Sequence, residues 1–263
     1  MSEAPSRNPA ARRARITAVT SGKGGVGKTF VSANLAAALA RQGERVLVLD
    51  ADLGLANLDV VLNLFPKVTL HDVFTGKCTL EAALLKAPGG FHALLAGSGL
   101  VEYSRMTPEV QQQLQDIINQ VTPRFDHVLL DTGAGISDVV LYTISLADEL
   151  LVVATPEPTS LTDAYATIKV LAGTQSRRRI GFVLNQARKP GEGRAVAGQL
   201  QQGVDRYVNP GLEEPVRIEL MGELPVDPAV REAVIKRTLL LEWQPGAPVS
   251  RAVVDLATRV RGQ

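Results

Sequence analysis

The stretch Ser21-Gly-Lys-Gly-Gly-Val-Gly-Lys-Thr29 decides the fold of this 263-residue chain. From Gly22 to Thr29 it fits the phosphate-loop pattern G-x-x-x-x-G-K-[ST], between an apolar β-prone run, 16–19, and a helix-prone run, 31–40. The glycines let successive backbone N–H groups turn toward one anion, and the following helix points its positive end there. Lys28 would neutralise the β- and γ-phosphates, and the Thr29 hydroxyl would bind Mg²⁺. The loop therefore predicts a nucleoside triphosphate site, formed by Gly22, Lys23, Gly24, Gly25, Val26, Gly27, Lys28 and Thr29.

Two carboxylates, Asp50 and Asp52, follow a second apolar run, 45–49. Side chains alternate along a strand, so residues i and i+2 point to the same side, at the carboxyl edge where open α/β sheets bind ligands. Burying two anions together is unfavourable unless a cation or a reacting group shares the site. The pair is a candidate for the metal and catalytic centre, and the alternative is that one carboxylate caps the following turn.

A third carboxylate, Asp131, ends the apolar run 127–130 and precedes Thr132-Gly-Ala-Gly135. An aspartate here, downstream of a phosphate loop, has the Walker B layout and holds a Mg²⁺-bound water. The glycines beyond it let a backbone N–H approach the γ-phosphate. The candidate metal residues are Thr29, Asp50 and Asp131.

Composition limits the class of protein. Apolar residues make up 45% of the chain with few aromatics, which suits a large core around a buried parallel sheet. The net charge of +1 argues against a protein coated by nucleic acid. The single cysteine, Cys78, excludes an internal disulfide framework and favours a reducing compartment. With no signal core and no apolar run near the ~20 residues of a membrane span, we expect a soluble, cytoplasmic protein.

Strand-like and helix-like runs alternate along the chain. We expect strands at 16–20, 45–49, 91–96, 127–131, 150–155, 180–184 and 219–223, and a helix over 108–121 with Thr107 as its N-cap. This alternation predicts an α/β fold: a doubly wound, mostly parallel sheet with helices on both faces. We expect one domain, 16–263, behind a basic arm, 1–15. The arm contains four arginines and is expected to be disordered, with docking to an acidic partner, anionic lipid or DNA as the alternative.

The loop sequence GKGGVGKT, with its second lysine Lys23, resembles the deviant phosphate loop of the MinD/ParA family of P-loop ATPases. The resemblance covers 16–260, nearly the whole chain. It implies ATP and Mg²⁺ as cofactors, and an ATP-dependent homodimer in which Lys23 reaches the partner's nucleotide. Asp50-Ala-Asp52-Leu-Gly-Leu-Ala-Asn57-Leu-Asp59 is similar to the family's signature after this strand. By that similarity Asp52 orients the attacking water, Asp50 supports Thr29 and the Mg²⁺ shell, and Lys23, Lys28 and Asp52 are the catalytic residues.

The resemblance also implies an adenine site. Asn185 ends the run 180–184, where the family's asparagine reads the adenine edge, and the backbone near Pro225 completes the pocket. An Asx-turn without a ligand is the alternative for Asn185. Asn185 is followed by Gln186-Ala-Arg188 and lacks a lysine–aspartate pair for guanine, which favours ATP over GTP.

Within the family, the segments 54–59, 131–137 and 155–165 look like those of the FlhG (FleN) branch, MinD-like ATPases that limit flagellar number and position. That likeness implies an FlhF-like GTPase, a flagellar transcriptional regulator or a flagellar switch component as partner. Members commonly end in a helix that inserts in the membrane. Here the run 249–260 carries small apolar residues, so we expect it to pack against the sheet, and only a transient membrane contact stays open.

Two other functions stay open from the sequence. A ParA-type partition ATPase would bind DNA through arginines such as Arg177-Arg-Arg179. A non-catalytic, nucleotide-loaded scaffold would control a transcription factor by contact alone, although Asp52 and Asp131 favour a hydrolysing enzyme.

Overall fold

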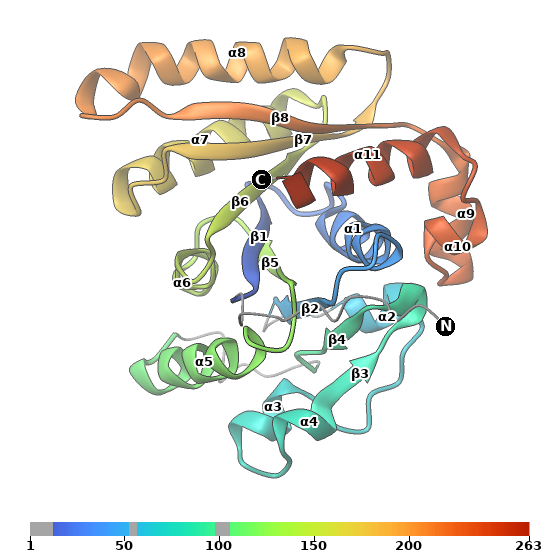
Figure 1. The fold of residues 1–263 in the computed structure, drawn as a ribbon. Coiled ribbons are helices and arrows are strands. Elements are labelled where there is room, and N and C mark those ends of the chain that lie inside the picture. The colour runs from blue at the N-terminus through green and yellow to red at the C-terminus, as the bar shows by residue number, and fades with distance from the viewer. Residues whose placement is uncertain (1–12, 53–56, 98–105, 263) are drawn as a thin grey trace, which may run out of the picture.

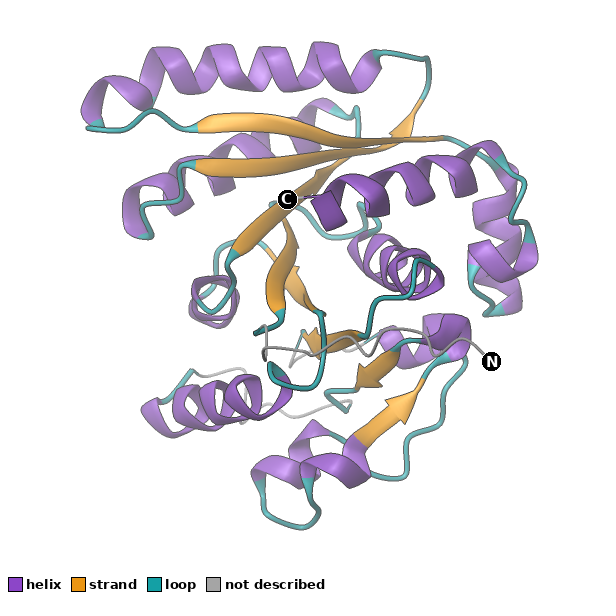
Figure 2. Ribbon diagram, in the orientation of Figure 1, coloured by secondary structure: helices purple, strands orange, loops and turns teal. Residues whose placement is uncertain are grey.

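The computed structural model describes residues 13–52, 57–97 and 106–262, and its strands form one sheet (Figures 1 and 2). The strands are β1 (Arg15–Ser21), β2 (Val46–Ala51), β3 (Leu84–Lys86), β4 (His92–Leu94), β5 (His127–Ala134), β6 (Glu149–Ala154), β7 (Arg179–Ala187) and β8 (Arg217–Pro225). Their order across the sheet is β3-β4-β2-β5-β1-β6-β7-β8. All neighbours pair in parallel except β3 and β4. The predicted doubly wound, mostly parallel sheet is confirmed.

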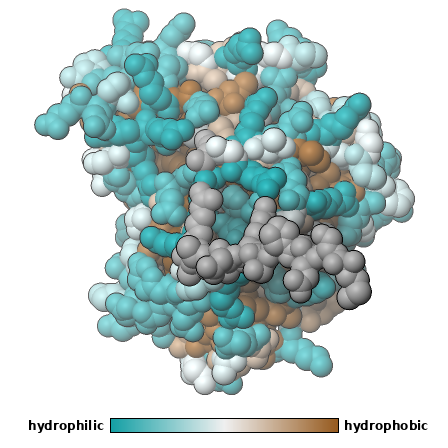
Figure 3. All heavy atoms as spheres, viewed as in Figure 1, coloured by the Kyte–Doolittle hydropathy of each residue, from teal (hydrophilic) through white to brown (hydrophobic). Residues whose placement is uncertain are grey.

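Helices cover both faces of this sheet (Figure 1). One face packs against α3 (Leu70–Phe74), α4 (Leu80–Ala83), α5 (Pro108–Val121), α6 (Asp138–Ser145), α7 (Pro158–Thr174) and α8 (Glu192–Tyr207). The other face packs against α1 (Lys28–Arg41), α2 (Leu58–Leu62), α9 (Pro228–Lys236), α10 (Leu240–Trp243) and α11 (Pro248–Gly262). Two short 3-10 turns, η1 (Pro88–Gly90) and η3 (Asn209–Gly211), complete these elements. Figure 3 shows mostly hydrophilic residues on the viewed surface, with hydrophobic ones in small separate areas.

The central strands supply both cores because their side chains alternate. In β1, Ile16 and Ala18 belong to the core on the α5–α8 face, whereas Val19 belongs to the core beneath α1 and α11. In β2, Leu47 and Leu49 face the first core. Strands buried on both faces read as continuous apolar runs, which is why the sequence located them.

Three details differ from the sequence expectations. The edge strand β3 was not predicted, because its three residues are too few to show a period and run antiparallel to β4. The strand expected at 91–96 is shorter, since β4 spans only His92–Leu94. The predicted arm 1–15 was too long: β1 begins at Arg15, and Ala14 is buried. Residues 1–12 of the arm lie outside the described residues.

The predicted N-cap of α5 is confirmed: the Thr107 hydroxyl accepts a hydrogen bond from the Val110 N–H at 3.4 Å, with Pro108 in the first turn. The packing expected for the last helix is also confirmed. In α11 the apolar residues are buried against α1 and β8, namely Val249, Val253, Leu256, Ala257 and Val260. No helix in the described part of the chain has the length and apolar character that a bilayer span requires.

The topology brings the predicted site residues to one edge of the sheet. β1 lies between β5 and β6, and β5 lies between β1 and β2. Asp50 of β2 is the parallel register partner of Asp131 of β5, and Asp131 is also the partner of Val19 of β1. The phosphate loop continues from β1 at this same edge, so residues more than 100 positions apart meet there.

Candidate functional site

The phosphate loop joins β1 to α1 in a conformation that needs glycine. Gly25 has φ +78° and Gly27 has φ +94°, both in the left-handed region. Gly27 is also the N-cap of α1, so the first turn of the helix opens directly from the loop. A Cβ on Gly22 would collide with the backbone of Asp163 in α7, and one on Gly27 would collide with the Asn185 amide. Neighbouring elements therefore hold the loop closely.

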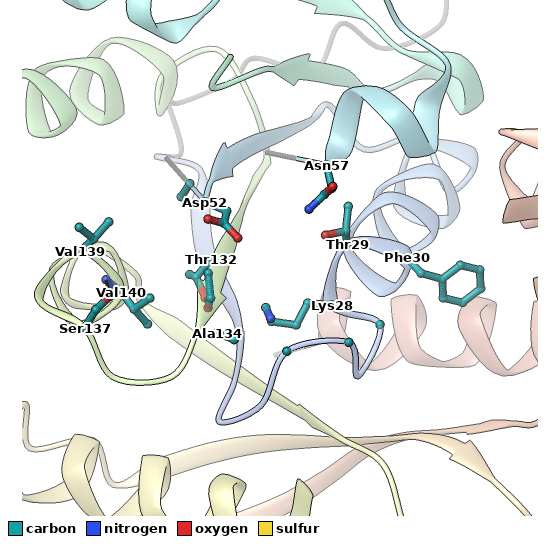
Figure 4. A pocket seen from close by; sticks show the side chains of 15 residues that line it. Lys28, Thr29, Phe30, Asp52, Asn57, Thr132, Ala134, Ser137, Val139 and Val140 are labelled. Carbon is teal, nitrogen blue, oxygen red and sulfur yellow. Dashed lines mark hydrogen bonds between the residues drawn. The ribbon is translucent and has the colours of Figure 1, made fainter. Parts of the chain in front are cut away.

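The loop borders a cavity of about 720 Å³ (Figure 4). The residues lining it come from the loop, α1, the ends of β2 and β5, and α6: Gly24, Gly25, Gly27, Lys28, Thr29, Phe30, Ala51, Asp52, Asn57, Thr132, Gly133, Ala134, Ser137, Val139 and Val140. A cavity of this size at the carboxyl ends of parallel strands, beside a helix N-terminus, fits an anionic nucleotide.

Lys28 reaches back along the loop. Its Nζ donates a hydrogen bond to Ser21 Oγ at 2.9 Å, and that hydroxyl donates to the Lys23 carbonyl at 2.7 Å. Burial lowers the pKa of Lys28, and the charges of Asp131 and Asp52 oppose that shift. A partly buried ammonium beside a loop of N–H donors is suited to phosphate oxygens, which would stabilise its charge.

Asp131 is fully buried in β5 and is held by two hydroxyls of α1. Ser32 Oγ donates to Asp131 Oδ1 at 2.9 Å, and the Thr29 hydroxyl also hydrogen-bonds to this carboxylate. Burial raises the pKa of Asp131 to about 6, although both hydrogen bonds and Lys28 favour the charged form. The charged form of a buried carboxylate is unfavourable without a counter-ion, so this site is suited to a cation.

Asp50 and Asp52 have different environments. Asp50 is 1% exposed, and its carboxylate accepts from the N–H groups of Asp52, at 3.2 Å, and Leu58, at 3.4 Å. Burial, followed by the charge of Asp131, raises the pKa of Asp50 well above its ordinary value. Asp52 lines the cavity and points into it (Figure 4). Asp50 therefore binds the backbone N–H groups of Asp52 and Leu58, as in the capping alternative, and Asp52 is the carboxylate that lines the cavity.

Lys23 lies at the outer shoulder of the loop. Its Nζ is 3.0 Å from Glu157 Oε2 and 3.0 Å from Thr159 Oγ1, both at the start of α7. The Lys23 side chain is 40% exposed, and Lys23 does not line the cavity. The structure thus separates the two lysines of the loop: Lys28 lies at the cavity and Lys23 faces outward.

Asn185 contacts the loop, Pro225 ends the neighbouring strand β8, and neither residue lines the cavity. Asn185 is buried in β7, where its Nδ2 donates to the Val26 carbonyl at 2.8 Å and its Oδ1 accepts from the Gln186 N–H at 3.0 Å. Pro225 is the last residue of β8 and pairs with Ala187 of β7. The bond to Gln186 is a local contact with the next residue and is not the bond two residues on that defines an Asx-turn. The bond to Val26 ties Asn185 to the phosphate loop.

Several site residues were missed by the sequence analysis. Thr132 lines the cavity and donates to the Val19 carbonyl at 3.1 Å, and Ser137 caps α6 at the cavity wall. The capping pattern before an apolar run was a readable signal for Ser137. Ser32 had no such signal, because only the packing of α1 on β5 brings it to Asp131.

The donor set fits a magnesium nucleotide. Among the described residues no group of three or more histidine, cysteine, aspartate or glutamate side chains could hold a metal ion alone. Mg²⁺ prefers few protein ligands combined with water and substrate phosphates. The Thr29 hydroxyl and the Asp131 carboxylate are oxygen donors of that kind, and they lie next to the loop that would hold the phosphates.

Comparison with known proteins supports this assignment. Residues 12–261 match the ParA family model, described as "NUBPL iron-transfer P-loop NTPase". The antiactivator FleN of Pseudomonas aeruginosa is 42% identical over 246 residues, which cover 94% of this chain and 86% of FleN. The flagellum site-determining protein YlxH of Helicobacter pylori is 29% identical over 245 residues, covering 92% of this chain and 80% of YlxH.

Solved structures agree with these relatives. The cell division ATPase MinD of Pyrococcus furiosus matches with a TM-score of 0.78 and 30% identity, covering 94% of this chain and 98% of MinD. The septum site-determining protein MinD of Pyrococcus horikoshii, solved complexed with Mg-ADP, matches with a TM-score of 0.76 and 28% identity, covering 94% and 96%. With its phosphate loop, Walker B carboxylate and sheet order, this chain belongs to the ParA/MinD family of P-loop NTPases.

Proposed function

We propose that this chain is a slow, Mg²⁺-dependent ATPase whose ATP-bound form is a homodimer. The observation that carries the proposal is the different position of the two loop lysines. Lys28 lies at the cavity, and Lys23 faces outward beside α7. A lysine that serves its own subunit's phosphates belongs at the cavity. One that points outward from the same loop can reach a second copy once its bonds to Glu157 and Thr159 are broken.

The residues at the cavity support hydrolysis. Phosphoryl transfer depends mainly on positioning and on stabilising charge. Lys28 and the loop N–H groups would bind the phosphates, and Thr29 and Asp131 would hold Mg²⁺, which neutralises developing charge on the γ-phosphate when bound. Asp52, the carboxylate that points into the cavity, would orient the attacking water. Asp50 would hold the turn that carries Asp52, through its bonds to the Asp52 and Leu58 N–H groups.

We propose ATP rather than GTP as the nucleotide. Asn185 and the backbone near Pro225 lie at neighbouring ends of β7 and β8, next to the loop. They would form the adenine pocket, and the spare N–H and lone pair of the Asn185 amide are available to a base edge. This assignment is supported by the resemblance and by proximity to the loop.

The biological role we propose is regulation of flagellar number or placement, supported by the likeness to FleN and YlxH. An FlhF-like GTPase, a flagellar transcriptional regulator or a switch component would be the protein partner. MinD of Aquifex aeolicus, another structural relative, was solved as a complex with MinC, so a protein partner has precedent in the fold.

The structure weakens the proposal of DNA binding through Arg177–Arg179, and the sequence argues against iron transfer. Arg177 donates to the Ile144 and Ala147 carbonyls at 2.6 and 2.7 Å, and Arg178 donates to the Ala172 carbonyl at 2.8 Å. Both guanidinium groups therefore already bind backbone carbonyls of the protein, which makes them less available to DNA phosphates. The family model's description mentions iron transfer, but Cys78 is the single cysteine of the chain. Cluster binding by thiolates requires more of them.

Three variants test the proposal. Phosphate release and size-exclusion chromatography would be measured with Mg²⁺ and ATP. Lys28→Ala should abolish ATP binding, whereas Asp52→Ala should keep binding and the dimer but lose hydrolysis. Lys23→Ala should keep ATP binding and lose the ATP-dependent dimer. A Lys23→Ala protein that dimerises like the wild type would refute the role of Lys23 across subunits.

A further inference from the structure

Ser32 occupies an unusual position for a serine in a helix. It lies in α1 one turn beyond Thr29, with 0% of its surface exposed, among apolar neighbours such as Val31, Ala33 and Leu35. A helical serine commonly bonds the carbonyl four residues back. Ser32 instead donates across to the sheet, to Asp131 Oδ1 at 2.9 Å.

Packing of α1 does not require the hydrogen bond between Ser32 and Asp131. Apart from Asn34, the buried positions around it in α1 are apolar, namely Phe30, Val31, Ala33 and Leu35, and alanine recurs along this helix, so an alanine would fit the space. A hydroxyl costs free energy when it is buried, unless it finds a partner. Here the partner is the carboxylate in the Walker B position, which already receives the Thr29 hydroxyl. Two hydroxyls at spacing i, i+3 on one helix face therefore converge on one carboxylate.

We propose that Ser32 is a positioning residue for magnesium: it fixes the orientation of the Asp131 carboxylate for the cation that accompanies the nucleotide. A carboxylate has two oxygens and about four lone-pair sites. With Oδ1 bound by Ser32, rotation of the carboxylate is restricted, and its remaining sites stay directed at Thr29 and at water held by the cation. The inference rests on the proposed binding of Mg²⁺·ATP.

The proposal separates two parts of nucleotide binding. The phosphate loop and Lys28 would contact the phosphates without Ser32, whose hydroxyl is bound to Asp131, so binding in the absence of Mg²⁺ should not depend on it. The additional affinity that Mg²⁺ provides passes through Thr29 and Asp131, and should depend on Ser32. A residue that only fills space in α1 would affect both parts equally, or neither.

The experiment measures ATP binding by isothermal titration calorimetry in EDTA and over a series of Mg²⁺ concentrations. The variants are Ser32→Ala, which removes the hydroxyl, and Ser32→Thr, which keeps it. The matched control is Ser250→Ala, since Ser250 is a buried serine of α11 whose Oγ donates at 2.6 Å to the carbonyl of Gln244, the C-cap of α10. Thermal unfolding of each variant reports whether it folds.

We expect Ser32→Ala to need about tenfold more Mg²⁺ to reach half of the Mg²⁺-dependent gain in affinity, as for a lost hydrogen bond to a charged group. Its affinity in EDTA should equal that of the wild type. Ser32→Thr should restore the Mg²⁺ midpoint, and Ser250→Ala should leave it unchanged. An unchanged midpoint in Ser32→Ala, or an equal loss of affinity with and without Mg²⁺, would overturn the proposal.

Two further outcomes are distinguishable. If Ser32→Ala fails to fold, Ser32→Cys is the deciding variant, because a thiol keeps the volume but is a weak donor. A wild-type Mg²⁺ midpoint in Ser32→Cys would then overturn the role of the hydroxyl. If the wild type binds no ATP, the proposed function itself fails; if it binds ATP and gains nothing from Mg²⁺, only the magnesium site and this inference fail.

Discussion

Lys23 and Glu157 form an ion pair at 3.0 Å that joins the outer shoulder of the phosphate loop to the start of α7. The pair connects segments 134 residues apart in the sequence. It satisfies the charge of Lys23 within one subunit, so a dimer that uses Lys23 must first break it.

Glu157→Gln should therefore favour the ATP-dependent dimer. Because the pair is partly exposed, at 40% and 53% for the two side chains, its contribution is at the low end for ion pairs. We expect the ATP concentration for half-maximal dimerisation to fall by roughly two- to fivefold. Analytical ultracentrifugation across an ATP series would measure this. Glu81→Gln is the matched control, since it removes an exposed pair with Arg124 at 3.1 Å. A midpoint that does not move would show that the pair does not oppose dimerisation.

Asn185→Ala should loosen the loop. The substitution leaves the Val26 carbonyl without the 2.8 Å bond from the Asn185 amide in a buried position. We expect the free energy of unfolding to fall by about 1–2 kcal/mol and ATP affinity to fall by about tenfold. Urea denaturation and calorimetry would measure the two effects. Unchanged ATP affinity with lowered stability would assign Asn185 a purely structural role.

Gly27→Ala tests the loop backbone itself. At φ +94° an alanine is strained, and its Cβ would collide with the Asn185 amide. We expect a loss of about 1–3 kcal/mol of stability in the ligand-free protein. Gly24→Ala is the control for stability, because a Cβ there meets nothing within 4 Å and its φ is not positive. Equal denaturation midpoints for the two variants would contradict this reading.

His127 should make the fold sensitive to acid. Burial lowers the pKa of His127 below its ordinary 6.5, with Glu44 opposing and Arg15 reinforcing the shift. The unfolded chain then takes up a proton near pH 6.5 that the folded chain does not, so this contribution to stability is present above that pH and is lost as pH falls toward the folded pKa. Comparing unfolding free energies at pH 7.5 and 5.5 would reveal the loss in the wild type.

The matching variant is His127→Gln, which cannot titrate. Its change in stability between the two pH values should be smaller than that of the wild type, since other groups titrate equally in both. Among the groups near this histidine, Glu149 has a pKa raised by burial and Asp126 has one lowered by its hydrogen bond with Arg45, so the wild-type profile alone would mix opposite slopes. Equal changes in the two proteins would remove His127 as the cause.

The sequence located most of the fold because its signals are local. The loop pattern, the apolar runs of β1, β2 and β5, and the cap of α5 each lie within a few consecutive residues, where period and turn chemistry can be read directly. The same local reading failed for β3, because its three residues are too few to show a strand period, although they pair with the next strand, β4. The sequence analysis also assigned Arg15 to the N-terminal arm, although Arg15 is the first residue of β1. A charged arginine gives no local signal for the start of a buried strand.

What the sequence alone determined, then, was the class of site: a phosphate loop, two carboxylate-ended strands and a spare lysine. Only the tertiary structure showed the different surroundings of these residues. Packing of α1 on β5 brings Ser32 to Asp131, and packing of α7 on the loop brings Glu157 to Lys23. Asp50 is buried within β2, whereas Asp52, just beyond the strand, lines the cavity. Such contacts join residues far apart in the chain, and spacing within a sequence carries no information about which side chains will meet.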